Sequence, residues 1–114
     1  MTNLDRLQLE LANREYLSEE QFSVILDENG LDAVSEYTAA NRKPLLQTVL
    51  NVFEILANDI DLFRKVESEF ATTGEAFSAL TARIQTVKNK ISAIDAETGV
   101  VANSVFSAMY FGGG

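Results

Sequence analysis

The chain has 114 residues, with 17 acidic and 9 basic side chains and a formal net charge of −8. This length fits one domain, and the 46% of apolar residues is enough for a core. The absence of His and Cys excludes disulfides, thiol nucleophiles and imidazole bases or metal ligands. The acidic balance argues against nucleic-acid binding, and no window has the roughly 20 apolar residues of a membrane span. The first residues show no signal-peptide pattern.

Two short helices are predicted first. The spacing of Leu4, Leu7 and Leu11 predicts a helix over about 4–13. Either Thr2 or Asn3 can cap its start. Ser18 and Gln21 form a capping box before a second helix over 19–29. Its inward residues are Phe22, Ile25 and Leu26, and it ends in a Schellman motif in which Gly30 is left-handed and Leu31 packs on Leu26.

Residues 31–41 read as a connector with one turn of helix over 32–37. A third helix begins near Asn41 as its cap, with Pro44 at its third position, where a proline costs no hydrogen bond. A broad apolar face predicts a central helix packed on more than one side, and it comprises Leu45, Leu46, Val49, Leu50, Val52, Phe53, Leu56 and Ile60. The same phase continues through Phe63, Val66 and Phe70. Asn58–Asp59 either breaks the run with a fresh cap or lies within one continuous helix, and we favour a kink or break.

A long fourth helix is predicted over 73–95. Thr72 and Glu75 form a second capping box, and a narrow seam with three- and four-residue spacing follows: Phe77, Leu80, Ile84, Val87, Ile91 and Ile94. Such a seam suits antiparallel packing on the third helix. The fold class is therefore all-α, a small bundle of four to five helices with a long antiparallel helical pair and an apolar C-terminal tail.

The charge is unevenly distributed along the chain. Residues 1–40 have a net charge of −7, residues 41–114 have −1, and no charged residue follows Glu97. We therefore divide the chain into one helical domain, 1–97, and an uncharged apolar tail, 98–114. The tail folds back on the bundle, stays disordered or docks on a neighbouring subunit or partner. In the docking hypothesis its partner-binding residues are Val101, Val105, Phe106, Met109, Tyr110 and Phe111.

No residue pattern predicts catalysis, a metal site or a cofactor. Each carboxylate pair is read as a solvated face: Glu19/Glu20, Asp27/Glu28, Asp59/Asp61 and Glu67/Glu69. Arg64 and Lys65 are expected to pair with nearby acids on one helix. Phosphate-binding glycine loops and activated serines have no matching motif. We expect the protein not to be an enzyme.

The layout resembles a known group of proteins. The segments that carry the resemblance are NREYLSEEQF (13–22), LDENGL (26–31), LANDID (56–61) and FATT (70–73). They resemble small proteins from bacteriophage and prophage structural-gene clusters, especially of gut Bacteroidetes, and the broader group of small all-α head–tail connector (neck or adaptor) proteins. The resemblance covers about residues 3–95 and implies a ring-forming subunit of the virion neck. No functional residue carries over from it.

Two functions remain open at this point. The first is a structural or assembly protein, connector-like, that forms homo-oligomers or contacts virion neck components. It would be found in the bacterial cytoplasm and, if phage-encoded, in the virion. The second is a small acidic regulatory binding module, such as an inhibitor or antitoxin, which the negative charge of residues 1–40 favours.

Overall fold

The computed structural model describes residues 1–98, which form five α-helices and one short 3₁₀ helix. The elements are α1 (Asn3–Glu10), α2 (Glu19–Glu28), η1 (Ala39–Asn41), α3 (Arg42–Asn58), α4 (Ile60–Glu67) and α5 (Thr73–Thr98). No β-strand occurs in this part of the chain, so the predicted all-α class is confirmed. The six residues predicted to bind a partner, Val101 to Phe111, lie outside the described residues.

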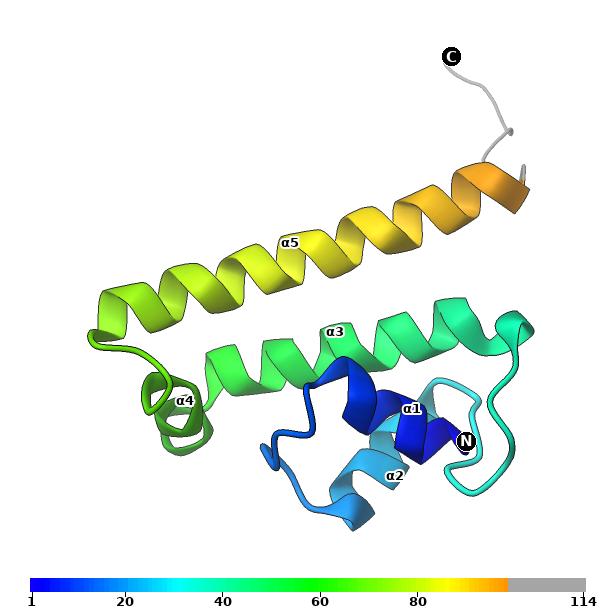
Figure 1. Cartoon of the computed structure of the whole chain (residues 1–114), viewed down its shortest axis with the longest axis horizontal. Helices are drawn as coiled ribbons and strands as arrows, with labels where there is room; N and C mark the ends of the chain where they lie inside the picture. The colour runs from blue at the N-terminus through cyan, green and yellow to red at the C-terminus, as the bar shows by residue number, and fades with distance from the viewer. Residues whose placement is uncertain (99–114) are drawn as a thin grey trace.

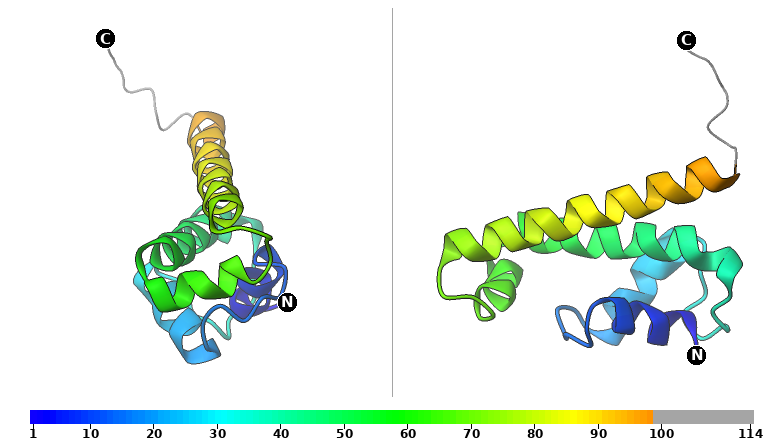
Figure 2. Two further views of the ribbon diagram at one scale, coloured as in Figure 1. Left: turned by 90° about the vertical axis from the view of Figure 1, so that its left-hand side faces the viewer. Right: turned by 45° about the horizontal axis from the view of Figure 1, so that its top comes forward.

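Helix α3 is the centre of the molecule. It contacts α1, α2, α4, α5 and η1. Helix α5 lies along it and runs in the opposite direction, while α1 and α2 lie on its other side and α4 crosses its end (Figures 1 and 2). Because α3 is packed on several sides, its apolar face is broad, as the sequence predicts.

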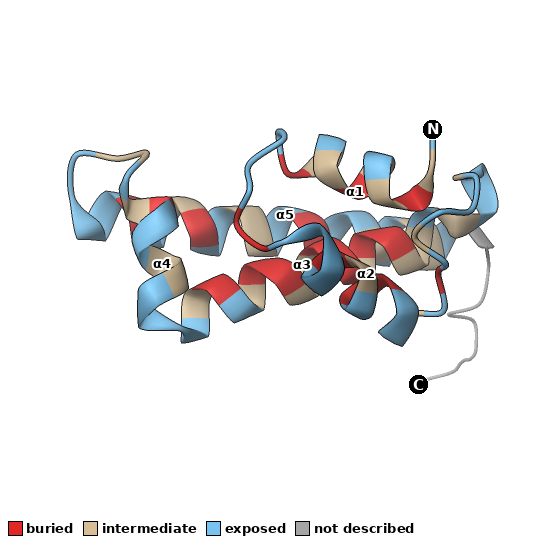
Figure 3. Ribbon diagram, turned by 90° about the horizontal axis from the view of Figure 1, so that it is seen from below, coloured by how far each residue is buried: buried red, intermediate tan, exposed pale blue. Residues whose placement is uncertain are grey.

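The core runs along the faces of α3 and α5 that meet, and on to α1 and α2 (Figure 3). Its fully buried side chains include Leu7, Phe22, Leu26, Leu45, Leu46, Val49, Val52, Leu56, Val66 and Leu80. Two polar residues are buried with them, Asn3 and Thr48. Both have hydrogen-bond partners, because the side-chain amide of Asn3 donates to the Asp32 carbonyl at 2.8 Å and the Thr48 hydroxyl donates to the Pro44 carbonyl at 2.9 Å.

Helix α2 has the predicted caps. The Ser18 hydroxyl accepts from the Gln21 amide at 3.1 Å, and the Gln21 side chain accepts from the Ser18 amide at 2.9 Å. At the other end Gly30 has φ +79°, and the Leu31 amide donates to the Leu26 carbonyl at 2.9 Å. The predicted Schellman motif is confirmed.

The predicted break between two helices is confirmed at Asp59. Of the apolar positions predicted around and beyond it, Val66 is buried and Phe63 and Phe70 are partly buried against the core, but Ile60 is not buried. Asp59 ends α3 and caps α4, because its side chain accepts from the Leu62 amide at 3.0 Å. Helix α4 then turns across the end of α3. Ile60 is therefore 76% exposed, and its predicted place on the buried face is wrong.

The first turn of α5 also differs from the predicted seam. Ala76 is fully buried, whereas Phe77 is 57% exposed and packs edge-on against Phe63, with ring centroids 6.4 Å apart. Further along, Leu80 and Val87 are buried as predicted. The seam positions Ile84, Ile91 and Ile94 are partly buried against the core.

The connector after α2 contains no helix over 32–37, so that prediction is wrong. Thr2 and Glu36 form an isolated antiparallel bridge, and the backbone amide of Asn3 donates to the Ser35 carbonyl at 2.9 Å. Amides at the start of a helix have no partner within that helix, and here the connector supplies their acceptors. A short 3₁₀ turn forms later, over Ala39–Asn41.

The start of α3 follows the sequence prediction in position but not in chemistry. Asn41 occupies the cap and Pro44 the third helical position. The Asn41 side chain does not cap the helix; its amide instead donates to the side-chain oxygen of Asn3 at 3.3 Å. A tertiary contact has therefore replaced the local one.

Candidate functional site

A carboxylate with little exposure links three parts of the chain that are distant in sequence. Glu69, in the turn after α4, has a side chain only 9% exposed. One of its oxygens accepts a hydrogen bond from the Tyr16 hydroxyl at 2.7 Å. Its other oxygen lies 3.7 Å from a guanidinium nitrogen of Arg14 and 3.7 Å from one of Arg83. Two cations and a phenol therefore share one carboxylate.

Tyr16 is held in the protonated form. Burial raises the pKa of its phenol above the ordinary value of 10.0, and the hydrogen bond to Glu69 and the negative charge of Glu69 raise this pKa further, while Arg83 acts in the opposite direction. A protonated phenol donates to the carboxylate and does not act as a base near neutral pH. The group serves as a link between segments.

A tight reversal after α1 brings Tyr16 and Arg14 to this place. Ala12 and Asn13 both have left-handed backbones, with φ of 56° and 58°. An alanine in this conformation costs roughly 1–2 kcal/mol, so tertiary contacts must hold the turn. One of them is the Lys65 ammonium, which donates to the Tyr16 carbonyl at 2.9 Å.

Sequence reasoning misses this cluster. Glu69 is not part of a solvated pair, and Lys65 contacts a carbonyl in place of a neighbouring acid, so both predictions are wrong. Arg64 does lie 3.7 Å from Asp61. Tyr16 and Glu69 are 53 positions apart, and no local spacing relates them. The pairs Glu19/Glu20 and Asp27/Glu28 are exposed, as predicted.

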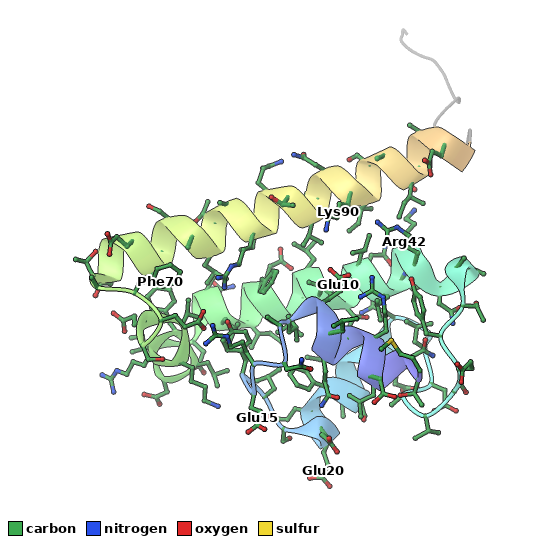
Figure 4. The ribbon with its side chains drawn as sticks, in the orientation of Figure 1. Glu10, Glu15, Glu20, Arg42, Phe70 and Lys90 are labelled. Atoms are coloured by element: carbon green, nitrogen blue, oxygen red, sulfur yellow. The ribbon has the colours of Figure 1, made fainter. Side chains whose placement is uncertain are left out.

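Next to this cluster a groove runs between α1 and α5. Two adjoining hollows of about 150 and 290 Å³ form it, and both are lined by Glu10, Phe53 and Arg83. Further lining residues are Arg14 and Glu69 in the first hollow, and Val49, Ala82, Thr86, Val87 and Lys90 in the second. Glu10 and Lys90 mark its two sides in Figure 4. We call this feature the α1–α5 groove.

The groove has an apolar floor and an excess of positive charge at its rim. Val49 and Phe53 of α3 form the floor and are almost fully buried. The Glu10 carboxylate forms an ion pair with the Arg6 guanidinium at 2.7 Å, which balances its charge. Glu69 balances only one of the three cations Arg14, Arg83 and Lys90. On a chain of net charge −8 this is a local reversal of sign.

Compared with protein-family models, curated proteins and solved structures, the chain matches none of them. Within residues 1–98 no three Asp or Glu side chains come together as a possible metal site. None of the helices over these residues is both long and apolar enough to cross a membrane.

Proposed function

We propose that the chain is a non-enzymatic structural or assembly protein that binds other protein chains. The α1–α5 groove carries this proposal. Apolar side chains inside a polar rim are the usual composition of a protein-binding surface, and because Val49 and Phe53 are only 1% and 6% exposed, the charged rim of this groove would make most of the contact. The non-enzymatic part of the proposal is supported by Glu69. Its carboxylate is already engaged by Tyr16 and two arginines and so is not a free acid or base beside the groove.

The subunit we propose is of the head–tail connector type, found in the bacterial cytoplasm and in the virion if the gene belongs to a phage. The supporting feature is the sequence resemblance over residues 3–95, together with a compact helical bundle followed by an uncharged apolar tail. The tail residues Val101, Val105, Phe106, Met109, Tyr110 and Phe111 are proposed to contact a neighbouring subunit or neck protein.

Mass measurement tests this proposal. We expect chain 1–114 to form oligomers or to bind a portal or neck protein, measured by light scattering and native mass spectrometry. Chain 1–98 keeps all described helices and should bind more weakly. If both chains stay monomeric up to high concentration and neither retains a virion protein, the proposal is wrong.

A regulatory binding module is the second candidate. The exposed carboxylates of α2, which include Glu19, Glu20, Asp27 and Glu28, favour it because an acidic helix face suits a basic target. A pull-down from host lysate that recovers one host enzyme, with loss of that enzyme's activity and no virion protein, would replace the assembly role with this one.

A further inference from the structure

Helix α2 exposes a face that matches the α1–α5 groove in charge. Glu20, Asp27 and Glu28 are exposed on one side of this helix. Val24 lies among them and is 58% exposed. Three carboxylates thus surround an apolar side chain, while in the groove three cations surround an apolar floor.

The spacing of the charges matches too. Glu20 and Asp27 are seven residues apart on α2, which is about 10 Å along a helix axis. Arg83 and Lys90 are also seven residues apart on α5, so they span about the same length. Val24 lies near the middle of the first pair, and Val87, which lines the groove but is only 6% exposed, lies near the middle of the second.

The two surfaces lie apart on the molecule. The groove lies between α5 and α1, whereas Glu20 points outward from α2 on the far side of α1 (Figure 4). A chain therefore cannot fill its own groove with its own α2, but a second copy can. We propose that the α1–α5 groove binds the outer face of α2 of a second copy of this chain.

This contact joins two different surfaces, so it repeats from copy to copy. Such a heterologous contact gives a ring if the rotation between copies closes and a filament if it does not. The inference rests on the proposed assembly function and specifies one of its contacts. Because the contact pairs exposed charges, self-association should weaken as salt is raised.

Charge reversal in the full chain tests the contact. Thr86→Glu/Lys90→Glu makes the groove acidic, and Glu20→Lys/Asp27→Lys makes the face of α2 basic. In a solution of either variant alone, the groove of one copy and the α2 face of the next then carry charge of the same sign. We expect self-association to weaken at least about tenfold, measured by analytical ultracentrifugation. Far-UV circular dichroism checks that each variant is folded.

Matched controls carry the same charge changes elsewhere. Gln85→Glu/Lys88→Glu changes the charge of α5 by the same amount on exposed positions that do not line the groove. Asp61→Lys/Glu97→Lys does so for the α2 variant, again at exposed positions. Both controls should associate like the unchanged chain.

Mixing the two variants is the decisive measurement. The acidic groove of one variant should accept the basic α2 of the other, so the mixture should form assemblies in which the two alternate, resolved by native mass spectrometry. The inference is wrong if the unchanged chain is monomeric, if the controls weaken association equally, or if mixing restores nothing. An unchanged chain that is monomeric yet binds virion proteins would overturn this contact and leave the assembly function standing.

Discussion

Glu69 shows how a single side chain connects distant segments. It joins the loop before α2, the turn after α4 and the side of α5 through Tyr16, Arg14 and Arg83. A carboxylate with so little exposure is costly unless its oxygens are paired, and here both are in use. This cluster contributes stability through contacts that each depend on the others.

We expect Tyr16→Phe to lower the free energy of unfolding by about 1–2 kcal/mol, because the buried carboxylate loses a hydrogen bond. Urea unfolding followed by circular dichroism measures this. Tyr37→Phe is the control, since the ring of Tyr37 lies 5.5 Å from the Arg6 guanidinium and keeps that contact without a hydroxyl. Equal losses in the two variants would contradict the role given to the Tyr16 hydroxyl.

The raised pKa of Tyr16 predicts a pH dependence at the alkaline end. The folded chain holds the phenolic proton more tightly than the unfolded chain, so its stabilising contribution is full below pH 10 and is lost as pH rises through the folded-state pKa. We expect the stability of the unchanged chain to fall more steeply above pH 10 than that of Tyr16→Phe. Parallel curves for the two proteins would show that another group is responsible.

At the scale of elements, helix ends are set by residues within a few positions. Ser18, Asp59 and Thr72 each accept a hydrogen bond from an amide three residues further on. These contacts need no distant partner, so sequence spacing predicts them. The direction of α4 is not set by such local contacts. It depends on which apolar surface at the end of α3 and the start of α5 is left for α4 to cover.

Two glycines should respond to alanine with opposite signs. Gly30→Ala places a side chain at φ +79° and should destabilise the chain by about 1–2 kcal/mol. Gly74→Ala lies in the first turn of α5, where the nearest atom to the new Cβ is 4.0 Å away, and should be neutral or stabilising by up to about 1 kcal/mol. Thermal unfolding of both variants decides; a loss at position 74 equal to that at position 30 would contradict this account.

For the whole molecule, the core is shared by all five helices and extends from Leu7 to Val87. We therefore expect chain 1–98 to have the same free energy of unfolding as chain 1–114, within about 0.5 kcal/mol, when both are measured as dilute monomers. A clearly less stable 1–98 would mean that the tail packs on its own bundle.

Sequence by itself determined the all-α class, the caps of α2 and the buried face of α3, because caps and helical periodicity act over a few residues; it favoured a break at Asn58–Asp59 but left a continuous helix open, and the structure decided for the break. Only the tertiary structure decided that Ile60 and Phe77 are exposed, that Glu69 is shielded, and that cations gather beside an apolar floor. Those features depend on how helices far apart in the chain pack together, and no short-range pattern records that packing. The polarity of charge along the sequence thus gains a spatial counterpart: an acidic α2 on one side of the molecule and a basic-rimmed groove on another.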